Sequence, residues 1–266
     1  MSCSPHVSCA EAGLATLWRA RRPRLPRLEV ELTERCNFDC VHCAINRPAT
    51  DACAAGELGL GEIREILQQA AALGALTVRF TGGEPLLRED FAEVYLAARR
   101  LGLRVALITN AALLTPALVD LLACVPPLER VEVSVYGMTP GTAEAVTNRP
   151  GAFEATRRGI ALLQERRVPF VVRTVVLPQN RHELRDFEAW SATLPRGQTA
   201  PFVVLLLSLR SRRDSAEKNR RIAALRTDPA AVVRLLNRRG PAYRAETREF
   251  CRRFLGVRGD KLFTCG

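Results

Sequence analysis

The chain has 266 residues, 47% of them hydrophobic, which is enough to bury the core of one large domain or two small ones. It has no apolar run approaching the roughly 20 residues that cross a bilayer, and its N-terminus lacks the basic-then-apolar order of a secretion signal. The sequence therefore predicts a cytoplasmic protein with no membrane partner.

The formal net charge is +11, and the basic residues are scattered through every segment. The densest stretches, residues 19–27 and 210–221, are not interleaved with the aromatic side chains that stack on bases. We therefore predict no nucleic-acid partner and interpret the charge as a solvated basic surface. Such a surface also suits the docking of an acidic electron donor, a flavodoxin or ferredoxin.

Short β-rich runs alternate with stretches of helical spacing. The runs are 28–33, 76–81, 103–109, 131–136, 170–177 and 202–208, and the helical stretches are 60–73, 90–101, 115–122, 152–166 and 182–194. This alternation predicts βαβ units with a parallel sheet, and the nearly continuous apolar runs predict strands covered on both faces. The repeats suit an open doubly wound sheet or a partial barrel, and both carry their chemistry at the carboxyl ends of the strands.

By pattern, the chain divides into three parts. Residues 1–26 form an arginine-rich leader, residues 27–208 hold the alternating core, and residues 209–266 follow it. In the last part we expect a charged loop over 209–221, a helix over 229–239 and a short cysteine-flanked end.

Residues capable of chemistry follow the ends of the β-rich runs. These are Cys36, Cys40 and Cys43 after the first run, then Gly82-Gly83-Glu84-Pro85, Asn110, Ser134 with Tyr136, and Asn180. Since the carboxyl ends of parallel strands meet at one edge of a sheet, the sequence predicts a single site there.

Cysteine is the most informative residue type in this chain. Nine cysteines without an export signal indicate metal or redox use rather than a disulfide framework. Cys36, Cys40 and Cys43 lie within eight residues, and thiolates are the usual ligands of iron–sulfur clusters. Three thiolates would leave one iron of a cubane open. A zinc site, with His42 or Cys53 as a further ligand, and unliganded thiols remain alternatives at this point.

The spacing CxxxCxxC after the first strand, together with Gly82-Gly83-Glu84-Pro85 after the second, resembles the radical S-adenosylmethionine superfamily over roughly residues 27–208. The resemblance implies a partial (β/α)6 TIM-like barrel and a 4Fe-4S cluster on the three cysteines. It also implies S-adenosyl-L-methionine, cleaved reductively to a 5′-deoxyadenosyl radical that abstracts hydrogen. His42 stands where the family often has an aromatic residue, and its flat face suits an adenine.

The resemblance also implies roles for other strand-end residues. The loop of residues 82–85 would receive the methionine amine, with Glu84 as a carboxylate acceptor. Ser134 would contact the ribose or the carboxylate, and Asn110 would line the cavity near the ribose or the substrate. Arg173, an arginine on an apolar run, would bind the methionine carboxylate, although a structural ion pair is the alternative.

The C-terminal Cys251 and Cys265 flank a glycine-rich turn that resembles the opening of a SPASM-type auxiliary-cluster extension. Two thiols cannot hold a cluster alone, so further residues after Gly266, other ligands or a structural role are the possible explanations. We favour an extension that is truncated here, and a possible auxiliary iron–sulfur cluster. Cys124, at a helix end, is expected to be a small buried hydrophobe.

The implied activity is hydrogen abstraction from a peptide or protein, as in the maturation of ribosomally made peptides. Two alternatives stay open: the same initiation on a small metabolite, and a non-catalytic iron–sulfur or zinc protein. The sequence does not specify the target atom, the fate of S-adenosylmethionine or the oligomeric state.

Overall fold

The computed structural model describes residues 25–45, 47–194, 202–205 and 215–228, together with residues 230, 231, 234 and 245. Most of the leader and of the C-terminal part, including Cys251 and Cys265, lies outside the described residues, as does most of the helix expected over 229–239. The division into three parts and the extension therefore stay predictions.

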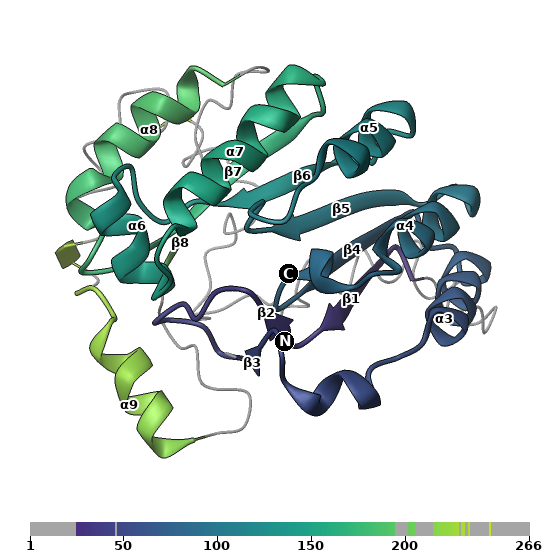
Figure 1. Ribbon diagram of the computed structural model, residues 1–266, viewed down its shortest axis with the longest axis horizontal. Coiled ribbons are helices and arrows are strands. Elements are labelled where there is room, and N and C mark those ends of the chain that lie inside the picture. Colours follow the sequence, from purple (N-terminus) through teal and green to yellow (C-terminus); the bar gives the residue numbers. More distant parts are fainter. Residues whose placement is uncertain are drawn as a thin grey trace, which may run out of the picture.

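The core is a six-stranded parallel sheet whose strand order follows the chain. Its strands are β1 (Arg27–Thr33), β4 (Thr77–Gly82), β5 (Arg104–Thr109), β6 (Leu128–Ser134), β7 (Phe170–Val176) and β8 (Phe202–Leu205). Since the order never reverses, right-handed crossovers place every connecting helix on the same face. Figure 1 shows these helices along the outer side of the curved sheet. The partial barrel is thus confirmed, and the doubly wound sheet is excluded.

The predicted helices are present with small shifts at their ends. They are α3 (Leu60–Ala72), α4 (Phe91–Arg100), α5 (Pro116–Cys124), α7 (Ala152–Glu165) and α8 (Leu184–Ala192). Cys124 is exposed, contrary to expectation, because the buried face of α5 carries Val119 and Leu122 instead. Over the described part of the chain, no helix combines the length and the apolar character that a membrane crossing requires.

Several short elements escaped the sequence analysis. The strands β2 (Arg35–Cys36) and β3 (Arg47–Pro48) form a separate pair, and three single-turn helices, η2 (Ala52–Gly56), η3 (Pro85–Leu87) and η4 (Arg181–Glu183), occupy loops. The helix α6 (Pro140–Thr147) has too few apolar residues to show helical periodicity. Its start is nevertheless marked locally, because Thr139 caps the helix and Pro140 follows at its first position.

The helix α9 (Ala216–Ala224) replaces much of the charged loop expected over 209–221. Ser215 caps it by accepting a hydrogen bond from the Lys218 amide, and a Glu217–Arg221 ion pair joins successive turns. Ile222 is its buried residue. One apolar side chain gives no periodic signal, which is why the sequence suggested a loop.

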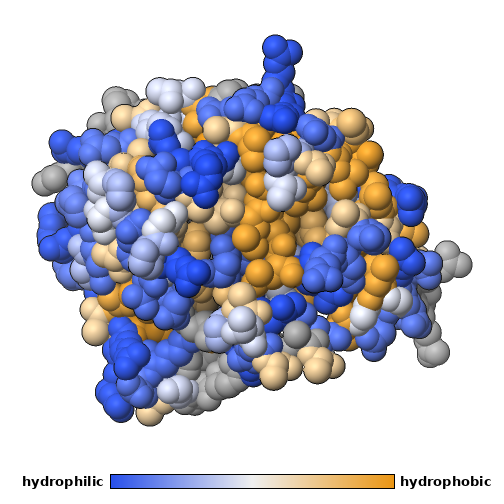
Figure 2. All heavy atoms as spheres, in the orientation of Figure 1, coloured by the Kyte–Doolittle hydropathy of each residue, from blue (hydrophilic) through white to orange (hydrophobic). Residues whose placement is uncertain are grey.

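The two faces of the sheet differ, which corrects the prediction of strands that are apolar on both sides. The face toward the helices carries the core side chains, among them Leu32, Phe80, Leu107, Val133 and Val172. The alternating residues on the concave face include Glu29, Arg79, Arg130, Glu132 and Arg173, which are joined by ion pairs. Each fully buried apolar side chain contributes roughly 1.5–3 kcal/mol. Figure 2 shows hydrophobic atoms toward the middle of one view, surrounded by hydrophilic side chains.

Candidate active site at the carboxyl ends of the strands

The three cysteines lie on one loop, residues 36–45, which we call the cysteine loop. Backbone amides point at two of the sulfurs: the Phe38 N–H donates to Cys36 Sγ at 3.4 Å, and the Ile45 N–H donates to Cys43 Sγ at 3.4 Å. The Cys43 amide closes a turn on the Cys40 carbonyl at 2.9 Å. The local backbone therefore presents the thiols with hydrogen-bond donors suited to a thiolate.

The three thiols form no disulfide and are close enough to influence one another. Burial raises the pKa of Cys36 to about 12, with a further contribution from Glu84 and Cys43. Burial also raises the pKa of Cys40 well above its usual value, reinforced by Cys43 and Cys36. Cys36 and Cys40 are thus protonated in the protein alone, and a bound cation would displace their protons.

Among the described residues, no group of three or more His, Cys, Asp or Glu side chains has the geometry to hold one metal ion. Three cysteine thiolates are the donors that an iron–sulfur cluster takes. Cys36, Cys40 and Cys43 would hold such a cluster.

The end of α6 holds the cysteine loop from one side. The amides of Asp39 and Val41 donate to the carbonyls of Thr147 and Val146, at 3.0 and 2.9 Å. Asn148 adds a side-chain bond from Nδ2 to the Asp39 carboxylate at 2.9 Å. The helix that the sequence analysis missed is therefore the one that orders the loop.

His42, the predicted adenine contact, is buried, with 6% of its surface exposed. Its ring meets Tyr136 edge-on at 4.9 Å, and the Tyr136 phenol is hydrogen-bonded to Ser134. Burial lowers the pKa of His42 to about 4, so the imidazole is neutral at pH 7. Its Nδ1 has no hydrogen-bond partner within the described residues. A buried polar atom in that state fits a site that a cofactor completes.

The two glycines at the end of β4 allow a backbone contact that no other residue would permit. The Gly83 amide donates to the Thr33 carbonyl at 2.7 Å, and the Glu84 amide donates to the Arg35 carbonyl at 2.8 Å. A Cβ atom on Gly82 or Gly83 would overlap those same carbonyls, and Gly82 has a φ of +139°. The loop of residues 82–85 is thereby fastened to the start of the cysteine loop.

Glu84 bridges two strand ends. It is 1% exposed, and its carboxylate accepts hydrogen bonds from Thr109 Oγ1 at 2.7 Å, the Asn110 amide at 2.8 Å and the Leu86 amide at 3.2 Å. Burial raises the pKa of Glu84 to about 7 despite these donors. Its predicted contact with a methionine amine stays a prediction, while the structure assigns the carboxylate to the end of β5.

Asn110 lies against the cysteine loop. Its Nδ2 donates to Asn37 Oδ1 at 2.7 Å and approaches Cys36 Sγ at 3.9 Å, while its Oδ1 accepts from the Ala112 amide at 2.9 Å. The sequence analysis did not identify Asn37, because the pairing depends on β5 lying beside the loop. The predicted contact of Asn110 with a ribose or substrate stays untested.

Arg173 forms a structural ion pair. The sequence analysis gave such a pair as the alternative to binding of the methionine carboxylate. Its Nη1 lies 3.2 Å from Glu132 Oε2, and the Glu132 side chain is 4% exposed. Arg79 and Arg130 both contact the other oxygen of Glu132 at 3.2 Å. Ser134, at the end of β6, is in register with Arg173 in the middle of β7, so the two face the same side of neighbouring strands. A guanidinium one-quarter exposed can still accept an anionic partner.

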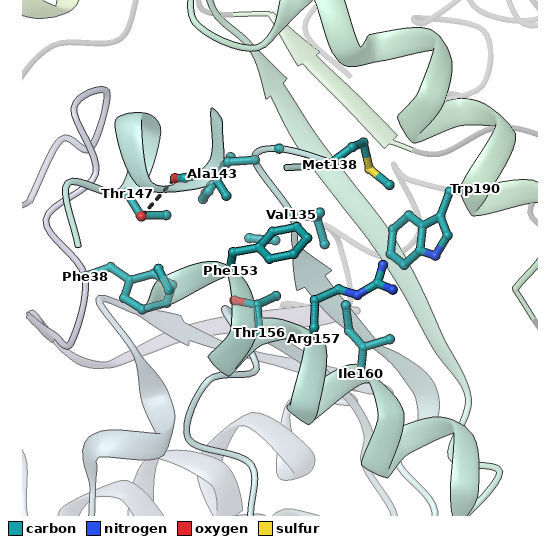
Figure 3. Close-up of a pocket in the computed structure, with 14 residues that line it drawn as sticks. Phe38, Val135, Met138, Ala143, Thr147, Phe153, Thr156, Arg157, Ile160 and Trp190 are labelled. Carbon is teal, nitrogen blue, oxygen red and sulfur yellow. Dashed lines mark hydrogen bonds between the residues drawn. The ribbon is translucent and has the colours of Figure 1, made fainter. Parts of the chain in front are cut away.

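A separate cavity lies between α6, α7 and the end of β6 (Figure 3). Phe38, Val135, Phe153 and Ile160 make it mostly apolar, and the Arg157 guanidinium lies over the Trp190 ring at 5.7 Å. Its volume is about 20 Å³, which holds one water-sized group. Phe38 belongs to the cysteine loop, so this cavity borders that loop.

Comparison with known proteins places this architecture in a family. The family described as the Radical SAM superfamily matches residues 30–190, more than half of the chain. The chain therefore belongs to the radical SAM superfamily.

Its relatives differ in what they act on. The chain is 38% identical over 165 residues to an AdoMet-dependent heme synthase of Methanosarcina barkeri, covering 61% of this chain and 46% of that protein. It is 35% identical over 158 residues to a PqqA peptide cyclase of Ruegeria pomeroyi, covering 59% and 41%. The chain thus spans less than half the length of these curated relatives.

A solved structure agrees with the fold. The Streptococcus suis protein SuiB, in its complex with the precursor peptide SuiA, matches with a TM-score of 0.56 at 18% identity, covering 70% of this chain and 42% of that one. At this identity the likeness supports the partial barrel alone.

Proposed function

We propose that this chain carries the catalytic core of a radical S-adenosylmethionine enzyme that abstracts hydrogen from a peptide or protein. The observation that carries the proposal is the cysteine loop: three interacting thiols, none in a disulfide, held beside the glycine loop of β4. The peptide substrate is supported by a relative named a peptide cyclase.

The chain's own residues would prepare and enclose the cofactors. When bound, the 4Fe-4S cluster on Cys36, Cys40 and Cys43 supplies the electron that cleaves S-adenosylmethionine to a 5′-deoxyadenosyl radical. The loop of residues 82–85 keeps one side of the cysteine loop in place, and Asn110 keeps the other.

The remaining predicted contacts suit the parts of S-adenosylmethionine. His42 offers a neutral nitrogen and a flat ring, which suit an adenine. Ser134 and Arg173 face the same side of neighbouring strands, which suits hydroxyl and carboxylate groups.

A small-metabolite substrate is the second candidate. It is favoured by the heme synthase relative, which matches over a similar stretch at slightly higher identity. A non-catalytic iron–sulfur protein is the third, and it differs from both in leaving S-adenosylmethionine intact.

The primary test is anaerobic. The protein is reconstituted with iron and sulfide, reduced, and given S-adenosylmethionine, and 5′-deoxyadenosine is quantified. We expect product from the wild type and from Cys124→Ala, whose cysteine is exposed and distant in sequence, and none from Cys40→Ala. A wild-type protein that holds a cluster yet forms no product would contradict the enzymatic proposal.

The substrate class is tested by isotope transfer. Perdeuterated cell extract is separated into peptide and small-molecule fractions, and each is added to the assay. We expect deuterium in 5′-deoxyadenosine with the peptide fraction. Transfer from the small-molecule fraction alone would favour the second candidate.

A further inference from the structure

The helix α9 also contacts the cysteine loop and helps to hold it in place. Lys218 Nζ donates a hydrogen bond to the Ile45 carbonyl at 2.9 Å, across 173 residues of sequence. Ile45 is also the residue whose amide donates to Cys43 Sγ. Both backbone groups of Ile45 are therefore engaged: its carbonyl accepts a hydrogen bond from Lys218, and its amide donates to Cys43 Sγ.

A buried anchor determines the position of α9. Ile222 is fully buried against Val146 of α6 and Leu177 after β7, with the partly buried Val41 of the cysteine loop packed on the same cluster. Removing such a side chain to Ala costs roughly 2–5 kcal/mol where the site is well packed. The helix is thus docked by a core contact, and Lys218 projects from it onto the loop.

The space between the two elements is open. A cleft of about 660 Å³ is lined on one side by Cys40 and Ile45 and on the other by Lys218 and Arg221. The Lys218 ammonium therefore faces the same cleft as a proposed cluster ligand. Solvent and small reductants can reach this side of the loop.

We propose that Lys218 is a positioning residue for the cluster, fixing Ile45 so that its amide donates to Cys43 and placing a positive charge beside the thiolates. The inference rests on the proposed cluster at Cys36, Cys40 and Cys43. Hydrogen bonds to the sulfurs and nearby charge set the potential of iron–sulfur clusters. Both effects stabilise the reduced, more negative form, so Lys218 raises the midpoint potential.

The test is potentiometric. The cluster is reconstituted in wild type, Lys218→Met, Lys218→Arg and Arg220→Met, and the reduced fraction is followed by electron paramagnetic resonance. Arg220 is an exposed cation on the same helix outside the cleft, so its variant removes an equal charge without the loop contact. Lys218→Arg keeps a charged donor at the position.

For Lys218→Met we expect the ratio of reduced to oxidised cluster at a fixed potential to fall about threefold to tenfold. This fall corresponds to a midpoint potential lower by about 30–60 mV for a one-electron couple. Lys218→Arg should recover most of this, and Arg220→Met should stay at the wild-type value. Ile222→Ala, which frees α9 from its anchor, should reproduce the Lys218→Met shift. A Lys218→Met protein that loses its cluster while Lys218→Arg keeps it would also support the role.

Equal potentials in Lys218→Met and Arg220→Met would overturn the inference. That result is distinct from failure of the proposed function, because a wild-type protein unable to form the cluster would show no iron–sulfur signal before any variant is compared.

Discussion

Glu84 shows how one buried carboxylate can join two strand ends. Its three donors come from Leu86 on its own loop and from Thr109 and Asn110 at the end of β5. The effect of burial outweighs that of the donors and raises the pKa of Glu84 to about 7. The residue that the family motif marks is thus also a structural bridge.

The raised pKa makes the contribution of Glu84 to stability depend on pH. The folded protein holds the Glu84 proton more tightly than the unfolded chain, so this contribution is complete below about pH 4.5 and is lost as pH rises through about 7. The free energy of unfolding of the wild type, minus that of Glu84→Gln, should fall by up to about 3 kcal/mol across this window. Urea titrations at pH 5 and pH 8 measure it. A difference independent of pH would contradict the assignment.

Gly83 lies so close to neighbouring backbone atoms that a side chain at this position would overlap them. In Gly83→Ala the new Cβ would overlap backbone atoms of Glu34 and Arg35, so the loop has to move. We expect a loss of roughly 2–4 kcal/mol of stability and weaker iron incorporation, because strained backbone contacts are costly. Gly141→Ala, in α6 with open space around it, is the matched control and should be neutral or stabilising. Equal stability of the two variants would show that the close approach is not required.

Among the elements, α6 depends on a distant carboxylate. Glu183 accepts hydrogen bonds from the Met138 amide at 2.6 Å, Thr139 Oγ1 at 2.6 Å and Thr142 Oγ1 at 2.8 Å. Burial alone would raise its pKa, but these donors outweigh burial and lower it. The start of α6 is therefore held by η4, and its end holds the cysteine loop.

Replacing this carboxylate should loosen α6. Glu183→Gln is expected to lose about 1–3 kcal/mol of unfolding free energy at pH 7, since charged hydrogen bonds are replaced by weaker ones. Because the folded pKa is lowered, the loss should shrink as pH falls below about 4.5. Denaturant unfolding at pH 7 and pH 3.5 checks both statements. A loss of unfolding free energy in Glu183→Gln that grows as the pH falls would contradict this prediction.

At the level of elements, the sequence predicted those with long apolar patterns. The six strands of the main sheet and α3, α4, α5, α7 and α8 were found this way. It missed α6 and placed a loop over part of α9, because one or two buried apolar residues give no period. Both helices touch the cysteine loop, so the missed elements are ones that shape the site.

For the whole molecule, the net charge of +11 bears on electron delivery. We propose an acidic flavodoxin or ferredoxin as donor. Opposite charges steer association, and salt screens them over about 10 Å at 0.1 M. The second-order rate of cluster reduction by such a donor should therefore fall roughly tenfold between about 0.05 and 0.5 M salt. Stopped-flow measurement, with an uncharged small reductant as the reference, tests this, and a rate unaffected by salt would count against the donor.

The sequence by itself determined the parallel α/β core, the grouping of three cysteines after the first strand and the glycine loop, because these depend on local spacing and on the period of apolar residues. The tertiary structure decided the partners of each polar group. Glu84 bonds to β5, Arg173 shares Glu132 with Arg79, and Lys218 reaches Ile45, all across large sequence separations. A buried charge or donor must find a partner wherever packing brings one within reach, and packing is a property of the folded chain.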